Sequence, residues 1–399
     1  MTKRLYYNSP YQIELKTTVT ECRKRADGLF NVLTAETIVF PAGGGQPSDI
    51  GKMNNASIVA AEDMGDDVFH IVDAIFDPGE TVTITIDWNR RFDHSQQHTG
   101  EHMVSGIAHS LFSVKNVGFH MGTDYVTIDF DKMLTKEQIN ELEMAVNRAI
   151  LMDIPVRSKI ISMEELSTIS LRKKADGISG AIRIVDIEGI ESCTCCGTHT
   201  LTTGGVGLLK ITDSMKHRGG IRLWMTCGMR ALVDYSGKHD TLIRLGKHFS
   251  TRWQNLEAAI LSQEKELADM RFEAKRRQLR YCELRAKELL SNTSGQFIAA
   301  IESDSEIEEI KLLCDRIIQE EDKITLLFGT KSDTIYYCIA RGSEVDISMK
   351  TLCLAVNAAL SGKGGGRDDI AQGSAKIDPC LPTPDLNMVI ANIRNIIHK

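Results

Sequence analysis

The sequence predicts a multidomain α+β protein. Its 399 residues exceed what one ordinary hydrophobic core serves, and its contents of 42% hydrophobic and 25% charged residues are those of a globular chain. Patterns typical of strands, of mixed structure and of helices follow one another in blocks. We expect four parts: a β-barrel at 1–90, an α+β domain at 91–235, a helical spacer at 236–295 and an α/β domain at 296–399.

The first part is predicted to be a small β-barrel. Short β-branched runs such as "FNVLTAETIVF" and "ETVTITIDW" are separated by glycine, proline and Asn/Asp. Between two runs lies "PAGGGQPSDIG", residues 41–51, whose three consecutive glycines and following proline do not suit a strand interior. We therefore expect a loop here, either a tight connection between strands or part of a binding site.

The second part mixes helices and strands. Amphipathic spacing predicts helices at 95–113 and 135–153, the second with a Thr-x-x-Gln start that resembles a capping box. Runs rich in β-branched residues predict strands at 125–130, 155–162, 181–187 and 207–213.

The third part is almost wholly helix-forming. Apolar residues from 253 to 284 recur at a spacing of three to four, which predicts a helical hairpin or an imperfect coiled coil and, with it, a homodimer. Its basic stretch, residues 271–287, is either a solvated helix face or a surface that faces phosphate or a second subunit.

The last part returns to α/β patterning. Strands are expected at 323–329 and 334–342, and a helix at 347–360. A second glycine-rich loop, 361–375, contains "GKGGGRDDIAQG". Its backbone N–H groups with nearby lysine and arginine suit contact with RNA phosphates, and a purely structural turn is the alternative. It does not have the spacing of a Walker loop.

Charge, hydropathy and cysteine content limit the expected partners and cellular location of the protein. The net charge of −7 does not indicate nucleic-acid binding, although basic residues are locally concentrated. No apolar run is long enough to cross a bilayer, and "MTKRLYYNSPYQIELK" lacks the apolar centre of a signal peptide, so we expect a cytoplasmic protein without a membrane partner. Most of the ten cysteines stand singly in apolar segments, and Cys227, Cys338 and Cys353 are expected to be buried.

Two short motifs together predict a metal site. His98 and His102 stand four residues apart in a helix, so both imidazoles share one face. Cys195 and His199 stand four apart across Gly197, where a tight turn can point both side chains the same way. One thiolate and three imidazoles favour Zn²⁺ over magnesium or calcium.

Three neighbouring residues leave alternatives open. His94 extends the helix face by a further turn and is expected to support the site rather than bind the metal. Cys193 or Cys196 could replace Cys195 as the sulfur ligand, and oxidation between neighbouring cysteines is a further alternative.

The motifs "FPAGGGQPSDIG", "HTGEH", "CCGTH" and "GKGGGRDDIAQG" occur in an order that resembles the editing half of alanyl-tRNA synthetase and the free-standing alanyl-tRNA editing proteins (AlaX), in particular their long form. The resemblance covers nearly the whole chain. It implies an N-terminal barrel, a zinc-bearing editing domain, a helical spacer and a C-terminal DHH-associated domain. Where this chain has Cys196, the family usually has glycine.

The resemblance also implies a function. It implies a hydrolase that deacylates tRNA(Ala) mischarged with serine or glycine, with zinc as the cofactor. The implied site residues are the metal ligands His98, His102, Cys195 and His199, the catalytic residue His120, the substrate-binding residues Gly43, Gly44, Gly45 and Gln46, and the RNA-binding residues Lys363, Gly364, Gly365, Gly366 and Arg367.

Two other activities of related proteins are not expected. Only about 90 residues precede the histidine pair, too few for a class II aminoacylation core, and the chain has no Asp-His-His motif for a phosphoesterase centre. Two alternatives to the editing hydrolase stay open. One is a non-catalytic tRNA-binding protein with structural zinc, and the other is a metallohydrolase that cleaves small aminoacyl esters or amides.

Overall fold

The computed structural model describes residues 1–162, 164–165, 182–377 and 382–398. The chain divides into two compact units, Met1–Arg244 and Leu245–Lys399. Within the described ranges, none of the helices has the length and apolar character needed to cross a bilayer.

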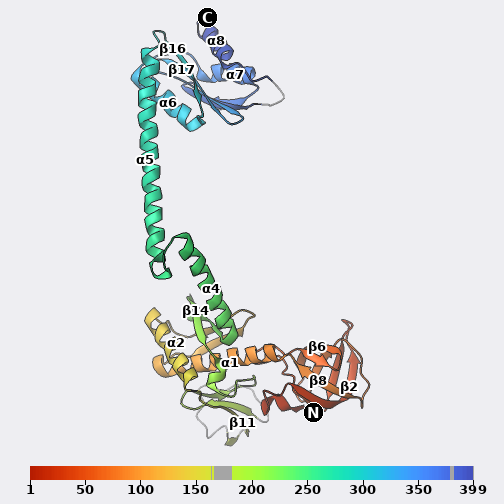
Figure 1. The fold of residues 1–399 in the computed structure, drawn as a ribbon. Helices are drawn as coiled ribbons and strands as arrows, with labels where there is room; N and C mark the ends of the chain where they lie inside the picture. Colours follow the sequence, from red (N-terminus) through yellow and green to blue (C-terminus); the bar gives the residue numbers. More distant parts are fainter. Residues whose placement is uncertain (163, 166–181, 378–381, 399) are drawn as a thin grey trace. The chain divides into compact units, whose positions relative to one another are not determined.

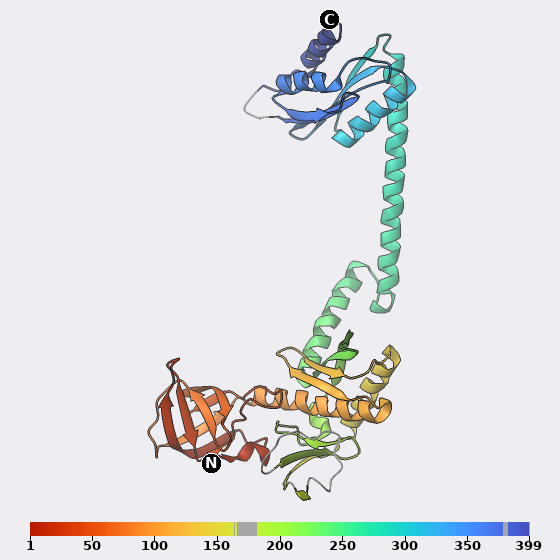
Figure 2. The ribbon, with the colours of Figure 1, turned by 180° about the vertical axis from the view of Figure 1, so that it is seen from behind.

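A closed barrel of six strands forms the N-terminal part of the first unit, which confirms the predicted barrel. Val19, Val32, Ile58 and Ile84 fill its interior and are almost fully buried. Figure 2 shows the barrel from behind, beside the start of α1. A short parallel pair, β1 (Lys3–Arg4) with β4 (Glu36–Thr37), lies outside it. In their order around the barrel, the strands are β2 (Glu14–Lys24), β3 (Phe30–Thr34), β7 (Val68–Val72), β6 (Ala56–Asp63), β5 (Gly51–Met53) and β8 (Thr81–Ile86).

Helix α1 (Trp88–Phe112) follows the barrel directly and begins seven residues before the predicted start at 95. The Asp87 carboxylate caps it by accepting a hydrogen bond from the Arg90 backbone N–H at 3.1 Å. Arg91 is fully buried, and its Nε donates to both carboxylate oxygens of Asp49 at 3.0 Å. This charged pair joins α1 to the glycine-rich loop at 41–50. Loss of either partner would leave a buried charge unpaired.

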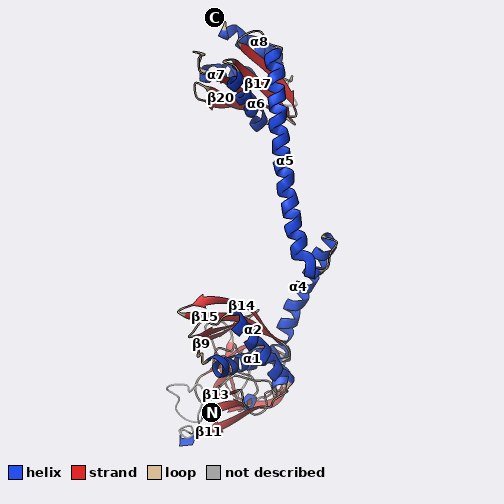
Figure 3. Ribbon diagram, turned by 90° about the vertical axis from the view of Figure 1, so that its left-hand side faces the viewer, coloured by secondary structure: helices blue, strands red, loops and turns tan. Residues whose placement is uncertain are grey.

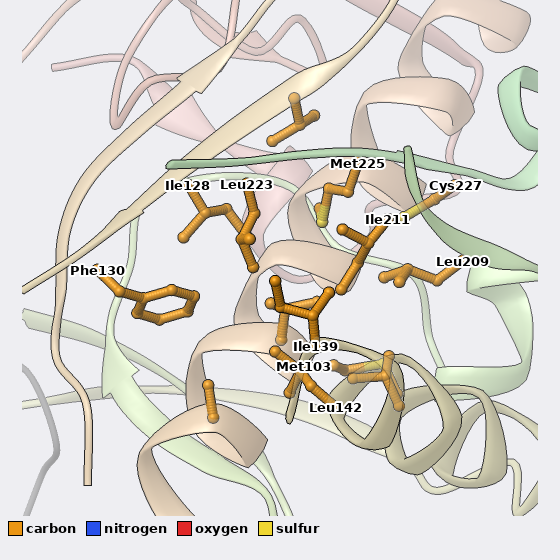
Figure 4. Packing of buried hydrophobic residues seen from close by; sticks show 14 of the residues in the cluster. Met103, Ile128, Phe130, Ile139, Leu142, Leu209, Ile211, Leu223, Met225 and Cys227 are labelled. Atoms are coloured by element: carbon orange, nitrogen blue, oxygen red, sulfur yellow. The ribbon is translucent and has the colours of Figure 1, made fainter. Parts of the chain in front are cut away.

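A four-stranded antiparallel sheet packs against α1 and α2 (Lys136–Leu151). Its order is β14 (Leu209–His217), β15 (Gly220–Cys227), β10 (Val126–Phe130) and β9 (Asn116–Met121). Figure 4 shows the core between them, where Met103, Leu142 and Leu223 meet. The predicted capping box is confirmed, since the Thr135 hydroxyl accepts from the Gln138 backbone and the Gln138 side chain accepts from the Thr135 backbone.

A separate three-stranded antiparallel sheet carries the cysteine-rich turn. It consists of β11 (Val156–Ile161), β12 (Ile182–Ile187) and β13 (Glu191–Thr194). The strands predicted at 155–162 and 181–187 are confirmed, apart from residue 181, which lies outside the described residues. The turn that follows β13 leads to the short 3₁₀ helix η2 (Thr203–Val206).

Two long helices follow. Helix α4 (Gly228–His248) begins earlier than the predicted helical part, and α5 (Leu256–Ser291) follows the short 3₁₀ helix η3 (Trp253–Asn255). Most of α5 is exposed; its first residue, Leu256, is buried, and its C-terminal turns enter a core through Cys282 and Ala286.

The second unit is built on a five-stranded sheet with helices on both faces (Figure 3). Helices α7 (Met349–Leu360) and α8 (Leu386–Ile397) cover one face, and α6 (Ile307–Glu320) with the end of α5 covers the other. The sheet order is β16 (Phe297–Ser303), β17 (Ile324–Lys331), β18 (Thr334–Arg341), β20 (Ile370–Lys376) and β19 (Lys363–Gly366).

The predicted glycine-rich loop at 361–375 is wrong. Residues 363–366 form the edge strand β19, which pairs with β20 from Lys363 opposite Ser374 to Gly366 opposite Ala371. The glycines allow this hairpin to lie over Tyr337, since a Cβ at Gly373 would stand 2.6 Å from Cε1 of that ring. The Tyr337 hydroxyl donates to Asn357 at 2.6 Å, so packing rather than loop geometry accounts for Gly373.

Candidate metal centre

Four side chains from two distant segments meet in the first unit. His98 and His102 come from consecutive turns of α1, and Cys195 and His199 from the turn after β13. One ligand atom of each residue lies within 4.8 Å of those of the other three. The Cys195 Sγ lies 3.4 Å from Nε2 of both His98 and His199. The predicted histidine and cysteine motifs are thus brought together.

The outward-facing ring nitrogens of the three histidines each have a neighbour. Nδ1 of His98 lies 2.8 Å from the amide oxygen of Gln46, and Nδ1 of His199 lies 3.2 Å from the Thr99 hydroxyl. Nδ1 of His102 lies 3.4 Å from the Cys193 Sγ. Such partners fix the orientation of imidazoles that use Nε2 to bind a metal.

Burial sets the protonation of the cluster. It lowers the pKa of His98 to about 3 and that of His199 well below its ordinary value, so both imidazoles are neutral and can donate a lone pair. It raises the pKa of the Cys195 thiol to about 12, so a thiolate here requires a nearby cation. A thiolate with three imidazole nitrogens is the donor set of a tetrahedral zinc site, and the residues present fit that ion.

The turn that carries Cys195 and His199 is held by Arg183 on β12. Its Nη1 donates to the carbonyl oxygens of Cys195 at 3.0 Å and Gly197 at 2.8 Å. A side chain at Gly197 would overlap the His98 ring and stand 2.9 Å from Oε1 of Gln46. Glycine is therefore required here by close packing, not by a positive φ.

The loop between strands that was expected at 41–51 is confirmed up to Ile50. Gly43 and Gln46 pair through both backbone hydrogen bonds at 3.0 Å, and Gly44 and Gly45 have φ of +58° and +82°. A substrate contact of the Gln46 side chain stays a prediction, and the structure gives this side chain a second role. Its Oε1 serves His98 and the Thr198 backbone N–H, and its Nε2 donates to the Thr198 hydroxyl at 2.8 Å. Gln46 therefore orients a metal-ligand candidate.

His120 is not brought to the cluster. It is exposed on β9, where its neighbour Phe119 stacks on the His98 ring with centroids 5.4 Å apart and planes inclined by 24°. Because successive side chains of a strand point to opposite faces, His120 points away from the centre that Phe119 covers. Phe119 also packs against Gly45, and a Cβ there would stand 2.6 Å from the ring.

The neighbouring candidates take distinct places. His94 is buried outside the ligand group, and burial lowers its pKa to about 4, so its supporting role stays a prediction. Cys193 lies behind His102, and Cys196 is exposed. Among the described residues, the grouped sulfur is that of Cys195.

Glu101 is a site residue that sequence reasoning missed. Only 6% exposed, it accepts hydrogen bonds at Oε1 from the Ser105 hydroxyl at 2.6 Å and the Asn116 amide at 2.7 Å. Its Oε2 lies 3.8 Å from Nε2 of His102. The signal was present, because "HTGEH" has the His-x-x-Glu-His spacing that places a carboxylate beside two zinc-binding histidines in one class of metallohydrolases.

The predicted RNA-binding residues belong to the second unit. Lys363, Gly364, Gly365 and Gly366 are exposed along β19, and Arg367 forms an exposed ion pair with Asp369 at 3.1 Å. The hairpin therefore presents its basic side chains to solvent.

Comparisons with known proteins cover both units. Residues 182–245 match the threonyl and alanyl tRNA synthetase second additional domain, and residues 294–396 match the DHHA1 domain. The alanyl-tRNA editing protein AlaX-L of Pyrococcus horikoshii is 29% identical, over 95% of this chain and 96% of its own length. The alanyl-tRNA editing protein Aarsd1 of Mus musculus is 29% identical over 91% and 88%, respectively. An alanine–tRNA ligase of Pyrococcus abyssi is 27% identical over 94% of this chain but only 42% of the ligase.

Proposed function

Because the chain resembles long-form alanyl-tRNA editing proteins along nearly its whole length, we propose that it is a trans-editing hydrolase that removes the wrong amino acid from tRNA(Ala). The observation that carries the proposal is the convergence of His98, His102, Cys195 and His199 on one point. The proposed substrates are tRNA(Ala) esterified with serine or with glycine.

Zinc is the proposed cofactor, held by His98, His102, Cys195 and His199. When bound, it would supply a positive charge that stabilises the Cys195 thiolate and attracts the polar end of the substrate. Four protein ligands are typical of a zinc ion with a closed shell. Positioning of the attacking water is therefore assigned to residues of the chain.

Glu101 is the proposed base. The ester that joins an amino acid to ribose is already activated, so its hydrolysis needs an oriented water and a stabilised oxyanion. Oε1 of Glu101 is fixed by Ser105 and Asn116, which leaves Oε2 on the side of the metal ligands. From there Oε2 takes a proton from water as the oxygen attacks the ester carbonyl, and the proton then passes to the leaving ribose hydroxyl.

A hydrolytic sieve is needed because size alone separates these amino acids poorly. A methyl-sized difference supplies about 1–3 kcal/mol of discrimination in a binding pocket. The loop from Gly43 to Gly45 and the ring of Phe119 form the proposed wall that limits which amino acid fits.

The second unit is the proposed carrier of tRNA affinity. Lys363 begins β19 and Arg367 follows its last residue; both are exposed and available for phosphate contacts. Such contacts would make deacylation of whole tRNA strongly dependent on salt. Self-association through the exposed apolar residues of α5 remains a prediction, as does the cytoplasmic location.

The direct test is ester loss from tRNA(Ala) charged with serine, glycine or alanine. We expect faster loss of the seryl ester than of the alanyl ester, abolished by chelation and restored by zinc. No selective loss at one zinc per chain would favour a non-catalytic tRNA-binding protein. Cleavage of small seryl esters at the rate seen with charged tRNA would favour the other alternative, a small-ester hydrolase.

A further inference from the structure

A cavity of about 360 Å³ adjoins the candidate metal centre in the first unit. The 3₁₀ helix η1 (Leu5–Tyr7) and the residues after it form one side, and β11 and β12 form the other. Figures 1 and 2 show the N-terminal segment beside the sheet that contains β11. The polar and charged side chains that line the cavity include Tyr7, Arg157, Ser158, Arg183 and His199.

Arg183 is the buried charged group of this cavity and is only 9% exposed. Its Nη1 is used by the carbonyl oxygens of Cys195 and Gly197, and its guanidinium lies over the Tyr7 ring, 5.1 Å from the centroid. Its Nε is buried and has no hydrogen-bond partner among the described residues. The edge formed by Nε and Nη2 is the edge with which arginine binds a phosphate or carboxylate through two parallel hydrogen bonds.

The unpaired Nε of Arg183 favours an anion. Arg157 also borders the cavity, but its pairing with Asp186 places its side chain on the opposite face of the sheet, where it lies 3.7 Å from the exposed Glu188. Burial of an N–H group without a hydrogen-bond partner costs free energy. A ligand that supplies the missing acceptor recovers this free energy when it binds.

The strand register connects this cavity with the metal ligands. Arg183 and Val185 are two residues apart on β12 and so share a face of the sheet. Val185 pairs with Cys193 of β13, and the Cys195 backbone N–H bonds to the Arg183 carbonyl. The cavity thus lies along the sheet face that also presents Cys193 and Cys195, and it reaches His199 directly.

We propose that this cavity binds the terminal nucleotide of the aminoacyl-tRNA, with the Nε–Nη2 edge of Arg183 receiving its 5′-phosphate. The inference rests on the proposed function, because that function places an ester of the terminal ribose at the adjacent metal centre. An ester substrate has no free carboxylate, so the phosphate is the anion nearest to the reacting bond. Arg183 is a positioning residue and not a catalytic one.

The test uses two minimal substrates, 3′-O-seryl-adenosine and the same compound with a 5′-phosphate. We expect the zinc-loaded full-length protein to cleave the phosphorylated compound with a kcat/KM roughly tenfold higher or more, the value of a charge-assisted hydrogen bond. Arg183→Lys should remove most of this preference. Because Arg183 also holds the turn with Cys195 and His199, the readout for this variant is the ratio of the two kcat/KM values and not either value alone.

A second pair of variants tests the phosphate site while the contacts of Arg183 with the turn stay in place. Ser158→Glu places a negative charge in the cavity without touching those contacts and should abolish the preference, whereas the matched Ser158→Gln should retain it. Calorimetric titration with AMP and adenosine gives a readout without catalysis, and AMP should bind roughly tenfold more tightly only where the preference survives.

The outcomes separate the two proposals. Equal cleavage of both compounds, or equal binding of AMP and adenosine by the wild type, overturns the phosphate site while the editing function stands. Cleavage of neither compound, together with stable seryl-tRNA(Ala), overturns the proposed function. Preferential binding of AMP would still support the phosphate site in that case.

Discussion

Replacement of Gly197 by alanine tests whether the cysteine turn and the histidine helix form one metal centre. An alanine Cβ would overlap Cε1 and Nδ1 of the His98 ring and approach Oε1 of Gln46 to 2.9 Å. Ordinary contacts between such atoms are about 3.5–4.0 Å, so the ring must retreat by more than about 1 Å. Because Gly197 is not among the glycines with positive φ, the effect is one of contact and not of backbone conformation.

Such a displacement removes two features of the centre at once. His98 loses its hydrogen bond to Gln46, and its Nε2 moves away from the Cys195 Sγ, now 3.4 Å distant. Loss of the residue that orients a metal ligand costs roughly 10–100-fold in metal affinity. With the added misplacement of the ligand itself, we expect zinc affinity to fall about 100-fold, which is about 2.7 kcal/mol.

The measurements are zinc per chain after dialysis and zinc affinity by competition with a chromogenic chelator. Seryl-tRNA(Ala) deacylation should fall in parallel, and thermal unfolding should show that the protein remains folded. Cys196→Ala is the matched control, because Cys196 is adjacent, exposed and outside the ligand group. If Gly197→Ala bound zinc as tightly as this control, the described proximity of turn and helix would be wrong.

Three further changes give independent checks. Glu101→Gln should retain one zinc per chain and lower kcat about 100-fold, as loss of a general base does, and an unchanged kcat would remove Glu101 from the mechanism. Burial lowers the pKa of His70 to about 4, so as the pH falls below 6.5 the imidazole is protonated in the unfolded chain before it is protonated in the folded protein. Denaturant titrations should therefore show that the free energy of unfolding falls by up to about 3 kcal/mol between pH 6.5 and 4. His70→Gln should flatten that dependence, and an identical slope in both proteins would refute the assignment. Met270, 63% exposed on α5, should support self-association, so Met270→Glu should shift sedimentation toward monomer; a wild type that is already monomeric at micromolar concentration would end that idea.

The fold was predictable where the spacing of apolar residues along the sequence indicates which side chains are buried. The barrel strands alternate, and the Thr135 capping box marks the start of α2. The start of α1 was not predictable, because arginine is usually a surface residue and the charged partner of Arg91, Asp49, lies 42 positions earlier in the loop at 41–50. A buried ion pair between segments leaves no local pattern.

The metal ligands were predictable for a similar reason. The spacing of His98 and His102 reflects one helical turn, and the turn at Gly197 brings Cys195 and His199 together, so each half carries its own signal. The residues that orient these ligands carry no such local signal in the sequence. Gln46 and Cys193 reach their histidines across 52 and 91 positions, and only the fold brings them close.

The glycines of the C-terminal hairpin could be needed for packing or for contact with RNA. Alanine substitutions at Gly364 and Gly365 can distinguish these two roles. A Cβ at Gly364 would stand 2.7 Å from the Gly373 Cα, whereas one at Gly365 would meet nothing within 4 Å. Gly364→Ala should therefore destabilise the hairpin by about 1–3 kcal/mol, as overpacking does, while Gly365→Ala should leave stability unchanged. If the exposed backbone of β19 approaches RNA phosphates, Gly365→Ala should still weaken tRNA binding in a filter-binding titration. Unchanged tRNA affinity in Gly365→Ala would leave Lys363 and Arg367 as the phosphate contacts and assign the glycine run to packing against Tyr337.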